Sequence, residues 1–283
     1  LVGASTSFAN LSEPAAAELR RRAIQTSWKA IADLGPLGGY GAVYGAVPDV
    51  PGREYQSFAR IAGANAPHRV LLQLPDGFDR QKRCLVVTAS SGSRGIYGAI
   101  ALAGAWGLPR GCAVAYTDKG AGSGYYDYAD NSGVALDGRR ARRGEAELEF
   151  QPPPAPSGAG IAVKHMHSGD NPEADWGRHV IQAAQFGLAM LDRAYPDEAP
   201  FTPQNTRIIA TGLSNGGFVV TWQDGLAGYN GSGSSTLGDT SGSAVKAQLY
   251  AADGSKVGGE FLVNTQTTGS QATPVVTGLS NGG

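Results

Sequence analysis

The sequence predicts an α/β domain with a mostly parallel sheet and flanking helices, followed by a small all-β unit. Short apolar runs suited to buried strands alternate with segments of helical periodicity as far as residue 212. After residue 217 the composition changes, because arginine, histidine and cysteine disappear while glycine, serine and threonine become abundant. A chain of 283 residues can hold one large domain and an appendage. We therefore predict two units, 1–217 and 218–283.

The elements of the first unit follow in order along the chain. A helix is expected to begin just after Ser12 and to carry apolar residues up to Leu34. Strands are expected at 54–61, 69–74, 83–88, 112–116 and 206–211, and helices at 98–108 and 172–195. The stretch 121–160 is predicted to be mostly irregular, as a lid or binding loop. Its arginine cluster, 139–143, is followed by glutamates, which favours a solvated mixed-charge surface over a site for an acidic substrate.

The two cysteines, Cys84 and Cys112, each lie at the start of an apolar, strand-like run. If these strands are parallel neighbours, the thiols lie at one edge of the sheet and can form a disulfide. Two buried, unreactive thiols are the favoured alternative. So few cysteines exclude a disulfide-dense scaffold and the multi-cysteine zinc patterns.

Composition excludes several classes of partner. A net charge of −1 and a pI near 6.5 give no electrostatic footprint for nucleic acid. No apolar run reaches the roughly 18 residues of a membrane-spanning helix. His165 and His167 form a His-x-His pair, but no third ligand follows at a recognised metal spacing. We therefore predict no metal and no cofactor, and we consider both histidines candidates for a substrate pocket.

The heptapeptide 211–217 contains Gly212-x-Ser214-x-Gly216, the nucleophile-elbow pattern of α/β-hydrolases. A serine on a sharp strand-to-helix turn needs minimal bulk two residues before and after it, which glycine provides. The apolar run before the motif suits a buried parallel strand. The segment after it, 218–223, is rich in β-branched and aromatic residues and predicts a strand where a helix should begin. The same heptapeptide returns at 277–283.

Four longer motifs resemble the 3-hydroxybutyrate-oligomer hydrolases, which are bacterial serine esterases. These motifs are VTASSGSRGIYG at 87–98, YTDKG at 116–120, VKHMHSGDNPEADWGRH at 163–179 and SNGG at 214–217. The resemblance extends over about residues 1–217. It implies an α/β-hydrolase fold, a small-molecule ester substrate from poly(3-hydroxybutyrate), no cofactor, and an extracellular or periplasmic location.

The resemblance also implies roles for individual residues. Ser214 would be the nucleophile of a carboxylic ester hydrolase. The backbone N–H groups of Asn215, Gly92 and Ser93 would form the oxyanion hole.

One feature departs from this family pattern. In the α/β-hydrolase order the triad acid and histidine follow the serine. Here all four histidines precede Ser214, and the residues after it include four acids but no histidine. Without a base the hydroxyl is a weak nucleophile. We therefore predict an incomplete hydrolase domain with little or no esterase activity.

The second unit, 218–283, resembles one tandem β-repeat of large secreted, often calcium-associated bacterial proteins. Four short strands are expected, at 218–223, 244–251, 260–265 and 274–277. The repeated heptapeptide suggests a chimeric junction at 217/218, with a natural fusion as the alternative. The alternative function is a non-enzymatic extracellular β-repeat protein in which Ser214 is a loop residue.

Overall fold

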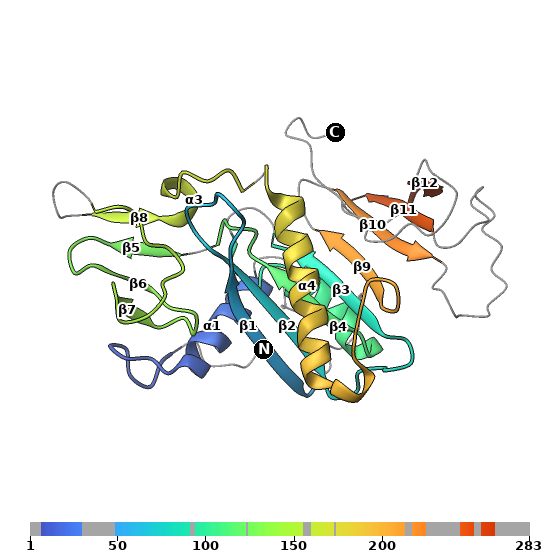
Figure 1. Cartoon of the computed structure of the whole chain (residues 1–283). Helices are drawn as coiled ribbons and strands as arrows, with labels where there is room; N and C mark the ends of the chain where they lie inside the picture. The colour runs from blue at the N-terminus through green and yellow to red at the C-terminus, as the bar shows by residue number, and fades with distance from the viewer. Residues whose placement is uncertain are drawn as a thin grey trace.

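A computed structural model describes residues 7–29, 49–90, 94–122, 124–154, 160–172, 174–212, 217–224, 244–251 and 256–263. Its centre is an eight-stranded mixed sheet in the order β1-β2-β4-β3-β9-β10-β11-β12 (Figure 1). A four-stranded sheet in the order β7-β6-β5-β8 lies beside it, on the left of Figure 1. Within these ranges no helix combines the length and apolar character needed to cross a membrane.

All five strands predicted before residue 212 are present in the large sheet, shifted by at most a few residues. They are β1 (Gly52–Ala59), β2 (His68–Pro75), β3 (Cys84–Ala89), β4 (Ala113–Thr117) and β9 (Arg207–Gly212). The parallel pairs are β3 with β4 and β3 with β9, whereas β1, β2 and β4 pair antiparallel. Ala89 lies opposite both Thr117 and Gly212, so the three parallel strands end together at one edge of the sheet.

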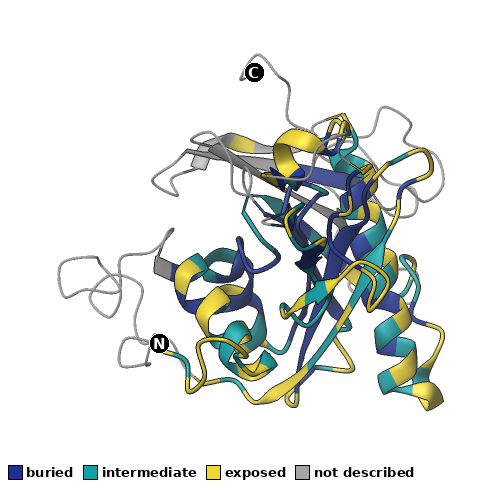
Figure 2. Cartoon of the chain, turned by 90° about the vertical axis from the view of Figure 1, so that its left-hand side faces the viewer, coloured by how far each residue is buried: buried dark blue, intermediate teal, exposed yellow. Residues whose placement is uncertain are grey.

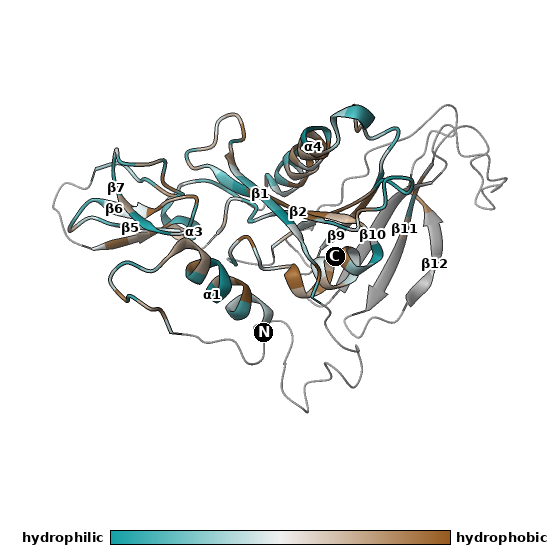
Figure 3. Ribbon diagram, turned by 90° about the horizontal axis from the view of Figure 1, so that it is seen from below, coloured by the Kyte–Doolittle hydropathy of each residue, from teal (hydrophilic) through white to brown (hydrophobic). Residues whose placement is uncertain are grey.

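Both faces of the central strands are buried, which explains their continuous apolar runs. Leu85 and Val87 on β3 pack against α4 (Trp176–Ala194), whereas Val86 faces the opposite layer. That layer contains α1 (Ala16–Lys29) and the short turns η1 (Ile100–Gly104), α2 (Ala105–Gly107) and η2 (Leu108–Arg110). Buried residues fill the middle of Figure 2, and α4 shows apolar and polar stripes in Figure 3.

The first helix begins at Ala16, several residues after the predicted start at Ser12. The Asn10 side chain instead holds a turn by accepting the N–H of Ser12, at 3.1 Å. The Glu18 carboxylate accepts the N–H of Ala15 at 3.1 Å, which satisfies a donor at the helix start. The remainder of the predicted helix, after residue 29, lies outside the described residues.

The predicted helix at 98–108 is broken into a π-helical, an α-helical and a 3₁₀ turn. Glycines bring this segment close to the sheet. A Cβ on Gly104 would lie 2.5 Å from the Tyr116 hydroxyl, and one on Gly107 would lie 3.0 Å from Val114. The close approach to β4 thus depends on residues that weaken a regular helix.

Cys84 and Cys112 form a disulfide, with an S–S distance of 2.10 Å and a Cα–Cα distance of 4.6 Å. The favoured expectation of two unpaired thiols was therefore wrong. The reason is strand register: Leu85 lies opposite Ala113 on neighbouring parallel strands, so the preceding cysteines are adjacent.

The described part of the stretch 121–160 is mostly turns and irregular backbone, as predicted, but it also contributes three short, unpredicted strands to the second sheet. Its strands are β5 (Tyr125–Asp127), β6 (Ser132–Val134), β7 (Arg140–Arg142) and β8 (Ile161–Val163), all antiparallel. Each is only three residues long, too short for alternation to be visible in the sequence. The expected mixed-charge surface is confirmed for Arg140, which pairs with Asp127 and Asp130.

After residue 217 the large sheet continues through β10 (Gly217–Asp224), β11 (Ala244–Ala251) and β12 (Lys256–Leu262). The first two agree with the predicted strands, and the third begins before its predicted start. The fourth, at 274–277, lies outside the described residues. Thr221 on β10 pairs with Ala210 on β9, so the strands of the second unit extend the sheet of the first.

Candidate active site

The carboxyl edge of β3, β4 and β9 is the candidate active site. In open α/β sheets, ligands bind outside the carboxyl ends of the parallel strands. The predicted nucleophile Ser214 and the oxyanion donors Asn215, Gly92 and Ser93 lie outside the described residues. The strands that lead to them end opposite each other in the sheet, β3 at Ala89 and β9 at Gly212.

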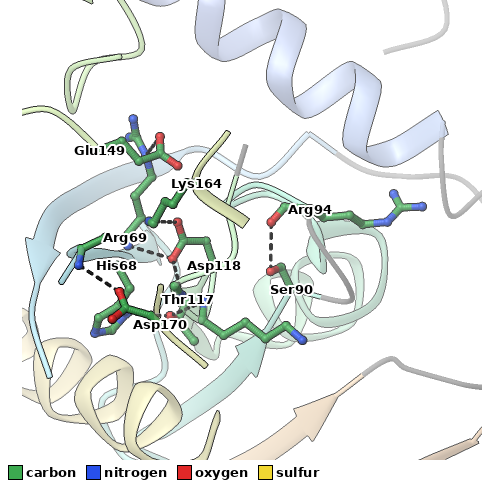
Figure 4. A network of polar contacts seen from close by, with 12 residues as sticks. His68, Arg69, Ser90, Arg94, Thr117, Asp118, Glu149, Lys164 and Asp170 are labelled. Carbon is green, nitrogen blue, oxygen red and sulfur yellow. Dashed lines mark hydrogen bonds and ion pairs between the residues drawn. The ribbon is translucent and has the colours of Figure 1, made fainter. Parts of the chain in front are cut away.

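A cluster of buried charged and polar side chains lies at the end of β4 (Figure 4). Lys164 Nζ lies 3.4 Å from Asp118 Oδ2, and both side chains are fully buried. Asp118 Oδ1 accepts the N–H groups of Arg69, at 2.9 Å, and Gly120, at 3.0 Å. Burial alone would raise the pKa of Asp118, but the charge of Lys164, the neighbouring His68 and these N–H donors together hold it below the ordinary value. Asp118 is therefore an ionised carboxylate that fixes the turn after β4.

His68 connects this turn to α4. Its Nε2 lies 2.6 Å from Gln182 Oε1, and its Nδ1 lies 2.9 Å from Thr117 Oγ1. The Gln182 amide nitrogen donates to the Arg60 carbonyl, which leaves Oε1 as an acceptor toward His68. The Thr117 hydroxyl accepts the Lys119 N–H at 2.9 Å and can donate to Nδ1. These partners fit a neutral imidazole with its proton on Nε2, and burial lowers the pKa of His68 accordingly.

A second buried histidine, His179 on α4, contacts His68 edge to face with ring centroids 4.6 Å apart. Burial, and then the neighbouring His68, lower the pKa of His179 to about 4. Within the described part of the chain its Nδ1 has no hydrogen-bond partner. Gly120, with φ of 73°, approaches the ring so closely that a Cβ would lie 3.0 Å from Nε2. Glycine at position 120 thus satisfies both the left-handed backbone and the contact.

A second buried ion pair joins β2 to the smaller sheet. Arg69 Nε lies 2.8 Å from Glu149 Oε2, and the guanidinium also donates to the carbonyls of Ala135 and Leu136. The Asp118–Lys164 pair also connects the two sheets, because Asp118 follows β4 of the large sheet and Lys164 directly follows β8 of the smaller sheet. We call these four charged residues the ionic seam. It fixes the smaller sheet beside the carboxyl edge of β4.

His165 and His167, the predicted pocket residues, are both exposed and lie on α3 (Lys164–His167). They are not part of the buried cluster, whose histidines are His68 and His179. His167 lines a cavity of about 530 Å³ between α3 and residues 150–154, and its Nδ1 lies 3.0 Å from the Val163 backbone. His165 is not among the residues that line this cavity.

Sequence reasoning missed the residues of the buried cluster. Three of these residues fall within motifs that carry the family resemblance: Asp118, Lys164 and His179. The spacing did not indicate that they are in contact, because Lys164 and Asp118 are 46 residues apart in the sequence. His68 had no sequence signal. Across the described ranges, no group of three or more His, Cys, Asp or Glu side chains is arranged to hold a metal ion.

Comparison with known proteins adds the family. Residues 1–222 match the family described as 3HB-oligomer hydrolase. The chain belongs to this family. D-(-)-3-hydroxybutyrate oligomer hydrolase from Cupriavidus metallidurans is 40% identical over 247 residues, covering 77% of the chain and 34% of the relative. The enzyme of the same description from Paracidovorax citrulli is 40% identical over 235 residues, covering 73% and 33%.

A third member of the 3HB-oligomer hydrolase family, from Cupriavidus necator, is 42% identical over 222 residues, covering 70% of the chain and 31% of the relative. The chain therefore spans about a third of the length of the curated relatives that it matches. The family match ends at residue 222, just after the predicted boundary at 217.

Proposed function

We propose that the chain carries the nucleophile and oxyanion-binding part of a serine ester hydrolase acting on D-3-hydroxybutyrate oligomers. The main observation is that β3 and β9 end opposite each other, with Ala89 beside Gly212. These strands lead to Gly92 and Ser93 on one side and to Ser214 on the other. The substrate class comes from the relatives, which are described as D-(-)-3-hydroxybutyrate oligomer hydrolases.

We further propose an α/β-hydrolase fold for residues 1–217. Support comes from the parallel strands β4, β3 and β9, and from the crossover segments on opposite faces of the sheet. The segment after the proposed nucleophile differs from the usual α/β-hydrolase pattern. In that pattern the nucleophile elbow leads into a helix, whereas here the next described element is the strand β10, antiparallel to β9.

In the proposed reaction, Ser214 Oγ attacks the ester carbonyl and loses its proton to a base. The backbone N–H groups of Asn215, Gly92 and Ser93 stabilise the oxyanion of the tetrahedral intermediate. The alkoxide leaving group departs with a proton, and water then hydrolyses the acyl-enzyme to release the acid and restore the serine. No histidine follows Ser214 in the 283 residues, so the proton acceptor of the usual triad order is missing from this chain. We propose slow acylation without efficient turnover.

Labelling with a fluorophosphonate probe, followed by peptide mapping, tests this proposal. The phosphonate should modify Ser214 slowly in the folded chain, because an oxyanion hole alone retains part of the catalytic advantage. The Ser214→Ala variant, shown by circular dichroism to be folded, should remain unlabelled. Absence of labelling in the folded parent chain, or equal labelling of the variant, would overturn the proposal.

We also propose an extracellular or periplasmic location. The Cys84–Cys112 disulfide supports it, because disulfides persist mainly in oxidising compartments. Rapid alkylation of thiols in cell fractions tests this point. Recovery of the chain only from the cytoplasm, with both cysteines alkylated, would contradict it.

A further inference from the structure

The cavity beside α3 has a volume in the range of small-molecule sites and is open to solvent. Its volume is about 530 Å³, and small ligands commonly occupy cavities of roughly 300–1,000 Å³. The lining combines apolar and polar groups, among them Asn65, Arg143, Phe150, Pro152, His167 and Ser168. A ligand that fits would have a short apolar part and a charged or hydrogen-bonding end.

The walls of the cavity are held by hydrogen bonds between distant segments. The Asp170 carboxylate accepts the N–H groups of Asn65, at 2.8 Å, and Ala66, at 2.9 Å. The Asn65 amide donates to the Ser168 carbonyl at 3.1 Å. Phe150 is buried in the core of the smaller sheet, together with Ala66. The cavity is thus preorganised, which reduces the cost of ordering it around a ligand.

Arg143 gives the cavity its positive charge. Arg139 and Arg140 pair with carboxylates, whereas Arg143 has no carboxylate partner among the residues that the structure describes. Its guanidinium donates one N–H to the Pro152 carbonyl at 2.6 Å and lies 5.6 Å from the centroid of the Tyr126 ring. A guanidinium has five N–H donors, so most remain for a ligand.

His167 supplies a second polar group to the lining of the cavity. Its Nδ1 is 3.0 Å from both the N–H and the carbonyl of Val163. When Nδ1 accepts the Val163 N–H, the neutral ring carries its proton on Nε2, which can then donate to a ligand carboxylate. An imidazole and a guanidinium in one partly apolar cavity are complementary to a carboxylate on a short carbon chain.

We propose that this cavity binds the free carboxylate end of a short hydroxyalkanoate, with Arg143 as its ionic partner and His167 Nε2 as a second polar contact. Phe150 and Pro152 pack against the methyl-bearing carbon chain. The inference rests on the proposed function for the choice of acid, since every 3-hydroxybutyrate oligomer ends in one carboxylate. Inorganic phosphate shares the negative charge but has no apolar part.

Calorimetric titration of the full Ser214→Ala chain tests the site without hydrolysis of the ligand. Three probes are compared: the D-3-hydroxybutyrate dimer, its methyl ester and inorganic phosphate. The dimer should bind saturably. The methyl ester should bind at least about tenfold more weakly because it has no charged acceptor for Arg143. Phosphate should also bind at least about tenfold more weakly because it has no apolar part to bury.

Variants locate the binding to the cavity. Arg143→Gln should weaken dimer binding about tenfold or more, and Arg143→Lys should lose less because it keeps the charge. Arg142→Gln is the matched control, since Arg142 is the neighbouring exposed arginine and does not line the cavity. His167→Ala should weaken binding less than Arg143→Gln.

Four results would overturn the site: no saturable binding, equal affinity for the methyl ester, equal affinity for phosphate, or equal losses in Arg142→Gln and Arg143→Gln. Circular dichroism confirms that each variant is folded. The fluorophosphonate result on the parent chain separates the two proposals. Labelling of Ser214 without dimer binding removes only the cavity proposal, whereas dimer binding without labelling removes only the proposed nucleophile.

Discussion

Single residues at the carboxyl edge of β4 combine charge with complete burial. Asp118 and Lys164 are fully buried, so each charge is stabilised by the other in a place that water does not reach. An intact buried pair adds little net stability, but removing one partner leaves an uncompensated charge in a low-dielectric interior. The pair therefore matters most when it is broken.

Asp118→Asn should lower the free energy of unfolding by about 3–5 kcal/mol, because Lys164 then has no counter-charge. Urea denaturation followed by circular dichroism measures this loss. Lys164→Met should also destabilise, and the double variant should lose clearly less than the sum of the two single losses. Strict additivity would show that the two side chains do not interact.

His179 predicts a dependence of stability on pH. Its pKa is about 4 in the folded chain against an ordinary 6.5, so between these values the unfolded chain binds more protons. The free energy of unfolding should therefore fall as the pH drops from about 6.5 to about 4, by up to about 3 kcal/mol. His68, whose pKa burial also lowers, adds to this slope. The contribution of Asp118, whose pKa is lowered, is lost only as the pH falls below its ordinary 3.8.

Urea midpoints at pH 7.5, 6 and 5 check the predicted slope. His179→Gln removes the titrating ring and should flatten the pH dependence relative to the parent chain. An unchanged slope in that variant would assign the effect to other groups.

At the scale of elements, the sequence predicted what long apolar runs can reveal. β2, β3 and β4 are buried on both faces, and α4 carries a clear apolar stripe. Their hydrophobic patterns therefore predicted these elements correctly. The smaller sheet was missed because three-residue strands have no visible period. The sequence could not decide whether Cys84 and Cys112 are bonded, because bonding depends on the register between neighbouring strands. The pattern of a single strand does not encode that register.

Removing the disulfide with the double substitution Cys84→Ala and Cys112→Ala should cost about 3–4 kcal/mol of unfolding free energy. The bond closes a loop with a sequence separation of 28 residues, and the loss of unfolded-chain entropy grows with that length. Urea denaturation of the oxidised parent and the double variant measures the difference. Equal midpoints would mean that the link does not restrict the unfolded chain.

At the scale of the whole molecule, the candidate site is assembled from segments that are far apart in sequence. The family motifs contain Asp118, Lys164 and His179 but not His68, and they did not indicate that these four residues gather at one edge. Such contacts follow from the order of strands in the sheet, which local periodicity does not determine. The proposed nucleophile itself stays a sequence prediction.

Hydrolysis of the D-3-hydroxybutyrate dimer by these 283 residues should be slow, with little acylation of Ser214 and no efficient turnover. The reason is that, within these 283 residues, no histidine follows Ser214 to accept its proton. Release of the monomer, followed by chromatography, measures the rate. Clear turnover that disappears in Ser214→Ala would refute this and would indicate a base from another part of the chain.

We propose that the 217/218 boundary joins two sequences of different origin through their shared heptapeptide, with a natural fusion as the alternative. Sequencing one uninterrupted DNA molecule across codons 205–225 tests it. A native, unbroken reading frame there would exclude the chimera.

The ionic seam also has a consequence for how this protein can change over time. Its four charges come from four separate segments, near residues 69, 118, 149 and 164. Replacing one partner alone leaves an unpaired charge in the interior. Replacing both partners by apolar residues can leave the stability unchanged. Genetic drift at these positions should therefore proceed in coupled steps. In a collection of functional variants, position 69 should vary with 149, and 118 with 164.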